Sequence, residues 1–161
     1  MKAGEKIRRK DRMIIDRRKD VYRNLSTLKE STMCKICGAV FINGRWTWNE
    51  VSNGVRKVLC PACRRISDKL PAGIIQIKGE FCKNHRNEIL NLVKNVEKLE
   101  KTERPMERII NVREVKAHTL ITTTGIHIAR RVGEVLSRSY ACDLSFQYGD
   151  GEKSIRVFCN R

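Results

Sequence analysis

Two pairs of cysteines constrain the fold of this 161-residue chain more than any other feature. Cys34 and Cys37 form one CxxC pair, Cys60 and Cys63 form a second, and 22 residues separate the pairs. Four thiolates at this spacing can close around one zinc ion and leave no open position for catalysis. A disulfide pair or a redox dithiol would leave the second CxxC unexplained. The pattern therefore predicts zinc as a structural cofactor of a module over residues 31–70.

The charge of the chain indicates an acidic polymer as partner. The formal net charge is +16 and the pI is near 10.0, with 40% hydrophobic residues, which is enough apolar material for a folded core under a basic surface. No apolar run approaches the roughly 18 residues needed to span a bilayer, and the N-terminus lacks the apolar core of a signal peptide. We expect a cytoplasmic protein with a nucleic-acid partner, no membrane partner and no small-molecule substrate.

Three further cysteines, Cys82, Cys142 and Cys159, are left outside the predicted zinc site. An odd number fits small buried hydrophobic residues better than a disulfide framework. The sequence therefore predicts free thiols in a reducing cytosol.

Residues 1–30 are predicted to form a basic arm. Eleven basic residues face five acidic ones there, with too few apolar residues for a core. Such an arm is expected to order on a phosphate backbone, where each cation releases counterions; the alternative is a solvated charged tail. The candidate RNA-binding residues of the arm are Lys6, Arg8, Arg9, Lys10, Arg12, Arg17, Arg18 and Lys19.

Within the zinc module, alternating apolar residues flank Asn43-Gly44, which predicts a type I′ hairpin over residues 40–48. This hairpin would place Trp46 and Trp48 on one face. Beside Arg45, Trp46 could stack on RNA bases. Equally, the two rings could cover the metal site as a miniature core.

After the second cysteine pair, Arg64 and Arg65 are further RNA-binding candidates. They are expected in a short helical turn over residues 64–68 that ends before Pro71. A hairpin followed by such a turn is compatible with a ribbon-like or a treble-clef zinc fold.

Beyond a predicted hinge at residues 71–73, the pattern changes to that of an α+β domain over residues 74–161. The order is strand, helix, two strands, helix, two strands, with Thr124 expected to cap the second helix. This order predicts a split β-α-β (ferredoxin-like) α/β sandwich with one added strand. The expected strands cover 74–78, 107–115, 118–123, 143–148 and 153–159, and the expected helices cover 81–103 and 126–139.

Residues of the second helix complete the candidate RNA-binding set. His127 is expected at the exposed first turn of a basic helix, where an anion could bind, and Arg130 and Arg131 follow it. No Gly-rich phosphate loop and no Ser-His-Asp or Cys-His motif is present. The chain is therefore expected not to be an enzyme.

Two blocks, His85–Asn95 and Thr122–Glu134, resemble the nonsense-mediated-decay-protein-three family, whose members bind the large ribosomal subunit. With the paired CxxC motifs and Gly44-Arg45-Trp46, the chain looks more closely like short bacterial relatives labelled as affecting ribosome stability and mRNA decay. The resemblance implies ribosome association through Arg45, Trp46 and residues 126–134. Longer relatives have additional zinc ligands and further domains with nuclear transport signals, so nuclear export is not implied.

The expected function is that of a zinc-stabilised, non-catalytic ribosome-associated factor. It would bind ribosomal RNA and act in ribosome silencing or hibernation, or in subunit stability or assembly. One alternative is an RNA-processing or RNA-decay enzyme, although the sequence shows no cluster of carboxylates that would bind a catalytic metal. A second is a zinc-finger DNA-binding regulator, which would need a base-reading recognition helix that the sequence does not show.

Overall fold

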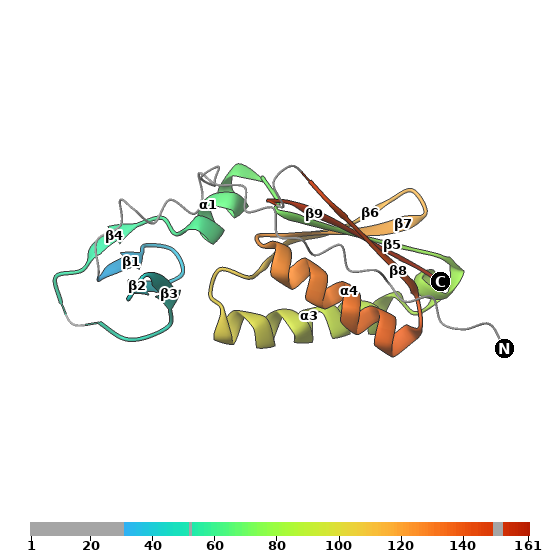
Figure 1. Cartoon of the computed structure of the whole chain (residues 1–161), viewed down its shortest axis with the longest axis horizontal. Coiled ribbons are helices and arrows are strands. Elements are labelled where there is room, and N and C mark those ends of the chain that lie inside the picture. Colours follow the sequence, from blue (N-terminus) through green and yellow to red (C-terminus); the bar gives the residue numbers. More distant parts are fainter. Residues whose placement is uncertain (1–30, 52, 150–152) are drawn as a thin grey trace.

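The computed structural model describes residues 31–51, 53–149 and 153–161. These residues form a mixed α/β structure with two mixed sheets and four helices (Figure 1). The predicted basic arm, with its eight candidate RNA-binding residues, lies outside the described part of the chain.

Four short strands build the sheet of the cysteine-containing module: β1 (Thr32–Cys34), β2 (Val40–Ile42), β3 (Arg45–Thr47) and β4 (Arg56–Val58). Their order is β3-β2-β1-β4, with β1 and β4 parallel and the other pairs antiparallel. The predicted hairpin is confirmed as the β2–β3 pair. Asn43 and Gly44 both have positive φ, 51° and 78°, as a type I′ turn requires.

The two tryptophans of the module have different environments. Trp46 is 8% exposed and packs on Phe41, with ring centroids 5.6 Å apart. Trp48 is 37% exposed, and its indole N–H donates to the carbonyl of Lys101 at 2.7 Å. The structure therefore supports the core alternative for Trp46, and the prediction that Trp46 stacks on RNA bases is not supported because its ring is buried.

Helix α1 (Pro61–Asp68) begins earlier than the predicted turn, directly at the second cysteine pair. Pro61 occupies the first turn, where its missing N–H costs nothing, and Cys60 is the N-cap residue. Lys69 ends the helix in a left-handed conformation. A ligand pair at the start of a helix agrees with the treble-clef alternative rather than with a ribbon.

The second sheet has five strands whose ends lie within two residues of the prediction. They are β5 (Gly73–Lys78), β6 (Ile109–Val115), β7 (His118–Thr123), β8 (Asp143–Tyr148) and β9 (Ile155–Asn160). The order is β6-β7-β5-β9-β8.

The first half of this sheet follows the split β-α-β plan, because β7 lies between β5 and β6. The ferredoxin-like arrangement as a whole is not confirmed. That plan would place β8 beside β5, whereas β9 pairs with β5 in parallel and β8 lies at the edge. Burial explains the order, since Ile155, Val157 and Cys159 of β9 are buried and β8 has no buried residue.

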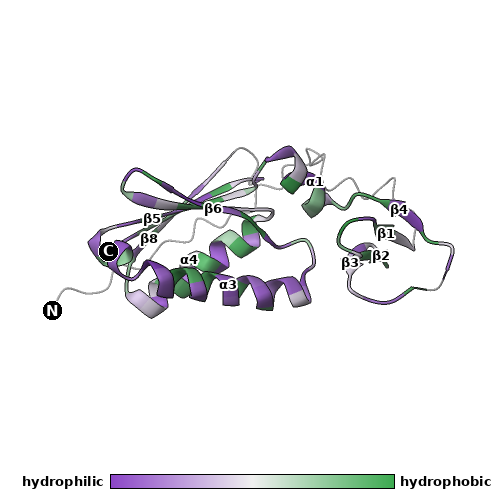
Figure 2. Cartoon of the chain, turned by 180° about the vertical axis from the view of Figure 1, so that it is seen from behind, coloured by the Kyte–Doolittle hydropathy of each residue, from purple (hydrophilic) through white to green (hydrophobic). Residues whose placement is uncertain are grey.

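Three helices, α2 (Glu80–Asn84), α3 (Arg86–Glu103) and α4 (Ile126–Tyr140), belong to this domain, and α3 and α4 cover one face of the sheet (Figure 1). Hydrophobic residues concentrate on α4, whereas α3 is largely hydrophilic (Figure 2). At Gly133 the helix approaches the sheet so closely that an added Cβ would lie 2.6 Å from Val157 Cγ1. The predicted single helix over 81–103 is broken at His85, whose ring stacks on Phe81.

The predicted hinge at residues 71–73 is tied to the five-stranded sheet by hydrogen bonds and is not a free linker. The N–H of Ala72 donates to the carbonyl of Thr123, and the carbonyl of Ala72 accepts from the N–H of Ile155. Gly73 is already the first residue of β5.

The prediction that the three remaining cysteines are all free is wrong. Cys142 and Cys159 form a disulfide with their Cα atoms 5.6 Å apart, so of these three cysteines only Cys82 is a free, buried thiol. Cys142 directly precedes β8 and Cys159 lies on β9, so the β8–β9 hairpin brings them together. Because the chain contains a disulfide, its cysteines no longer indicate a reducing compartment.

Among the described residues, no helix combines the length and the hydropathy that a membrane-spanning segment needs.

Candidate metal centre

The four predicted metal ligands lie together in the structure. The Sγ atoms of Cys34, Cys37, Cys60 and Cys63 are all within 4.8 Å of one another, and those of Cys37 and Cys60 are 3.7 Å apart. A tetrahedral ion with metal–sulfur bonds of about 2.3 Å places its sulfurs about 3.8 Å apart. Three of the cysteines are buried and Cys37 is half-buried. The cluster therefore has the size and the donor set of a metal site.

Backbone amides are directed at these sulfurs. The N–H of Cys60 donates to Cys34 Sγ at 3.4 Å, and the N–H of Cys63 donates to Cys60 Sγ at 3.3 Å. Gly38, with φ of 79°, closes the first knuckle by donating to the carbonyl of Cys34 at 3.0 Å. Such amides stabilise thiolates, which are the form of cysteine that binds metals.

The thiols differ in their acidity before any metal is bound. Burial raises the pKa of Cys34, but the amides of Cys37, Cys60 and Ile36 outweigh it and bring the pKa down to about 6. At Cys60 and Cys63, burial dominates and raises the pKa of each thiol. Of these three thiols, Cys34 therefore has the lowest pKa.

Arg108 completes the surroundings of the cluster, and the sequence did not reveal it. Its side chain comes from the segment between α3 and β6 and is only 6% exposed. One terminal nitrogen lies 3.1 Å from Cys37 Sγ, and the other lies 3.3 Å from Cys63 Sγ. Burial lowers the pKa of Arg108, but the hydrogen bonds to these two sulfurs outweigh it and raise it.

Charge explains why an arginine is buried here. A divalent cation bound by four thiolates would leave two net negative charges, and the guanidinium of Arg108 would offset one of them. Its Nε donates to the carbonyl of Pro105 at 2.7 Å, which fixes the orientation of the planar group. Groups in this position tune a metal site and orient its ligands.

The same segment joins the module to the α+β domain. The guanidinium of Arg108 lies 5.8 Å from the ring centroid of Trp48, and Trp48 itself is bonded to Lys101 on α3. Met106 packs against the buried cluster of the module. Arg108 also donates its backbone N–H to Thr124 Oγ1 at 2.9 Å. The surroundings of the candidate metal centre are therefore built by residues of both parts of the chain.

The start of α4 differs from the prediction. Thr124 does not cap the helix; its hydroxyl donates to the carbonyl of Met106 at 2.6 Å, and Gly125 is the N-cap residue. Instead the buried carboxylate of Glu107 accepts from the N–H of Ile128 at 3.0 Å. The anion position predicted near His127 at this helix start is thus taken by a carboxylate of the chain.

The three candidate RNA-binding residues of α4 each face a carboxylate. His127 lies 3.4 Å from Glu100 and also contacts Arg104. Arg130 lies 3.5 Å from Glu134, and Arg131 lies 3.7 Å from Glu100. The structure thus gives their charges local partners.

The candidate RNA-binding arginines of the module differ in their exposure. Arg45 and Arg64 are exposed, on β3 and α1 respectively. Arg65 is half-buried and donates to the carbonyl of Leu70 at 3.2 Å. Arg45 and Arg64 are therefore the candidates of the described chain best placed to meet a partner.

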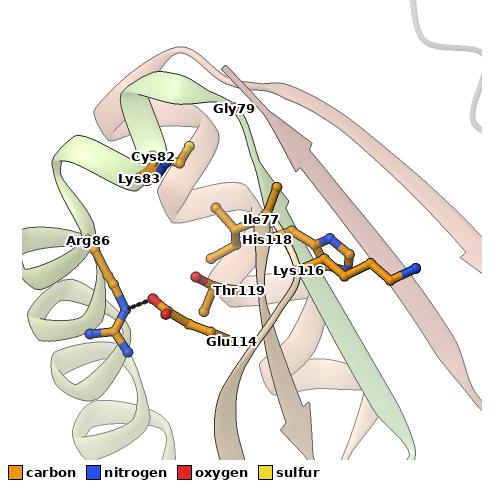
Figure 3. Close-up of a pocket in the computed structure, with 10 residues that line it drawn as sticks. Ile77, Gly79, Cys82, Lys83, Arg86, Glu114, Lys116, His118 and Thr119 are labelled. Carbon is orange, nitrogen blue, oxygen red and sulfur yellow. Dashed lines mark ion pairs between the residues drawn. The ribbon is translucent and has the colours of Figure 1, made fainter.

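A pocket lies at the other end of the α+β domain, beside the β6–β7 turn (Figure 3). Lys83, Arg86, Lys116 and His118 line it, and Arg86 forms an ion pair with Glu114 inside it. Among the described residues, the group of side chains that could hold a metal ion is the four-cysteine cluster, and none of its members lines this pocket.

Comparisons of the chain with protein-family models, with curated proteins and with solved structures found no match.

Proposed function

We propose that this chain is a zinc-stabilised, non-catalytic ribosome-associated factor that binds ribosomal RNA in the cytoplasm. It would act in ribosome silencing or hibernation, or in subunit stability or assembly. The observation that carries the proposal is a closed four-cysteine centre within a basic module. Residues 31–70 contain seven basic and two acidic residues, and six of the basic ones are exposed. A rigid surface of this charge suits a phosphate backbone.

Zinc is the metal that fits this centre best. Four soft thiolates around a tetrahedral position suit zinc or iron, and closed sites of four cysteines are typical of structural zinc. Elemental analysis of purified protein should give one zinc per chain. An iron site would show itself by its colour and by its absorption in the visible range.

The absence of catalysis in this proposal follows from coordination chemistry. Four protein ligands leave a tetrahedral ion without a site for water, so the ion cannot generate a nucleophile. Purified protein incubated with RNA and magnesium should leave the RNA intact and unmodified. Turnover that is lost on substituting His85, His118 or His127 in a folded variant would favour the enzyme alternative.

The ribosome is proposed as the partner because His85–Asn95 and Thr122–Glu134 resemble a ribosome-binding family. Contact through the module would use the exposed side chains of Arg45 and Arg64. The acid-paired residues of α4 would contribute less, since a phosphate must compete there with Glu100 and Glu134.

Sedimentation of tagged protein from a cell lysate through a sucrose gradient tests the proposal. We expect the protein in a ribosomal fraction, and less of it there for a variant with Arg45→Gln and Arg64→Gln. A matched control removes two exposed charges of α3, with Lys94→Gln and Lys98→Gln. Protein that stays at the top of the gradient, or equal losses for the two double variants, would count against the proposed surface.

A further inference from the structure

The five-stranded sheet has a second face that no described helix covers (Figure 1). Alternate residues of β5 and β9 are buried under α3 and α4, among them Ile75, Ile77 and Val157. The residues between them point to the opposite side. We call this opposite side the open face.

The centre of the open face combines apolar and hydrogen-bonding side chains. Gln76 of β5 is paired with Leu120 of β7 on one side and with Phe158 of β9 on the other, so the three lie in one row across the sheet. Ile74 and Thr122 form the next row. All five are half-buried, as expected for central strands with one side uncovered.

The rim of the open face is basic. By the same alternation, Lys78, Arg113 and Arg156 point to this side, and all three are exposed. Asp143, opposite Asn160 at the end of β8, is the acidic residue that the described strands place there. The acid of β6, Glu114, belongs to the other face, where it pairs with Arg86.

We propose that a single-stranded RNA segment lies across the open face, with one base stacked on the ring of Phe158. Arg113 and Arg156 would contact phosphates on either side, and the amide of Gln76 would bond a base edge. Unpaired bases stack on aromatic rings of a sheet, and a basic border follows the backbone. The inference rests on the proposed function and names the class of RNA structure that is bound.

Charge decides against other occupants of the open face. The arm over residues 1–30 has eleven basic and five acidic residues, and a second copy of the chain has a net charge of +16, so both would be repelled by the basic rim. A duplex offers phosphates to the rim but no unstacked base to Phe158. Single-stranded RNA supplies both.

Fluorescence anisotropy with a short labelled oligouridine tests the inference. Phe158→Leu should weaken binding about fivefold or more, because one base loses its stacking partner, whereas Phe158→Tyr should bind like wild type. Tyr148→Leu is the matched control, since Tyr148 is an exposed aromatic residue of the same sheet that is paired with Ile155, whose side is covered by helices. Melting curves check that each variant is folded.

A second pair of variants separates charge at this face from charge in general. Arg113→Gln with Arg156→Gln should weaken oligouridine binding more than Lys94→Gln with Lys98→Gln. Equal binding by wild type and Phe158→Leu, or tighter binding once residues 1–30 are removed, would overturn the inference. These results would leave the proposed function standing if the wild-type protein still sediments with ribosomes. If the wild-type protein does not sediment with ribosomes, the proposed function is contradicted, whatever the oligouridine assay shows.

Discussion

A terminal nitrogen of Arg108 lies 3.1 Å from the sulfur of Cys37, although the two residues are 71 positions apart in sequence. The contact places a charge from the α+β domain against the cluster of thiolates in the module. Since Arg108 is buried, its charge depends on these sulfurs for compensation. The cysteine cluster and the junction between the two parts of the chain are therefore electrostatically coupled.

Replacing this arginine should weaken metal binding. Arg108→Gln removes the guanidinium and leaves the negative charge of the loaded cluster without its partner, so zinc affinity should fall about 10- to 100-fold. The free energy of unfolding of the zinc-loaded protein should fall by about 1.5–3 kcal/mol, the range for hydrogen bonds to charged groups. Competition with a chromophoric chelator measures the first effect and denaturant unfolding the second. Arg104→Gln, at an exposed position four residues earlier, is the control, and equal zinc affinity in both variants would contradict the role of Arg108.

Removal of the metal should unfold the module. Its buried cluster has few large side chains, mainly Phe41 and Trp46, so the metal must supply much of its folding energy. Both tryptophans of the chain lie in this module, so their fluorescence reports on it directly. We expect a chelator, or Cys34→Ser, to shift the emission to longer wavelength. Unchanged emission after complete zinc removal would show that the module folds without metal.

Glu107 should stabilise α4 from outside the helix. Glu107→Ala removes the acceptor of the Ile128 N–H and a negative charge at the helix start, which should lower the free energy of unfolding by about 1–2 kcal/mol. Glu103→Ala removes an exposed acid at the end of α3 and is the matched control. Denaturant unfolding at neutral pH measures both variants. A loss no greater than that of the control would mean that the carboxylate does not cap the helix.

The disulfide predicts a thiol count. Five of the seven cysteines should react with a thiol reagent in denaturant after zinc removal, and all seven should react after reduction. Closing a loop with a sequence separation of 17 residues should contribute about 3 kcal/mol, so Cys142→Ser with Cys159→Ser should melt at a lower temperature than wild type. Seven reactive thiols without reduction would show that the protein contains no disulfide.

The grouping of the four cysteines and the positions of the strands could be predicted from the sequence, because both depend on local sequence patterns. Ligand pairs are recognised by their spacing, and a strand is recognised by alternation over six residues such as Asp143–Tyr148. No local sequence pattern indicates the order of the strands in a sheet. That β9 and not β8 lies beside β5 depends on which strand is buried more completely in the finished domain.

The side chains that connect the two parts of the chain could not be predicted from local sequence patterns. The sequence pattern predicts a strand at Glu107 and Arg108, because β-branched residues follow them, yet Glu107 caps α4 and Arg108 contacts the cysteine sulfurs. Both roles depend on contacts with residues at least 21 positions away. The odd number of cysteines outside the metal cluster predicts free thiols and so hides the disulfide, although Cys142 and Cys159 lie at the two ends of the predicted hairpin.

The most direct test of the account is pelleting of purified protein with ribosomes, with isolated subunits and with bulk RNA across a salt series. We expect tighter binding to ribosomes than to bulk RNA at every salt concentration. Deletion of residues 1–29 should flatten the salt dependence, with each lost phosphate contact removing about 0.7–0.9 from the slope of log affinity against log salt, while ribosomes remain the preferred target. Equal affinity for ribosomes and bulk RNA would contradict the central claim and reduce the binding to nonspecific electrostatics.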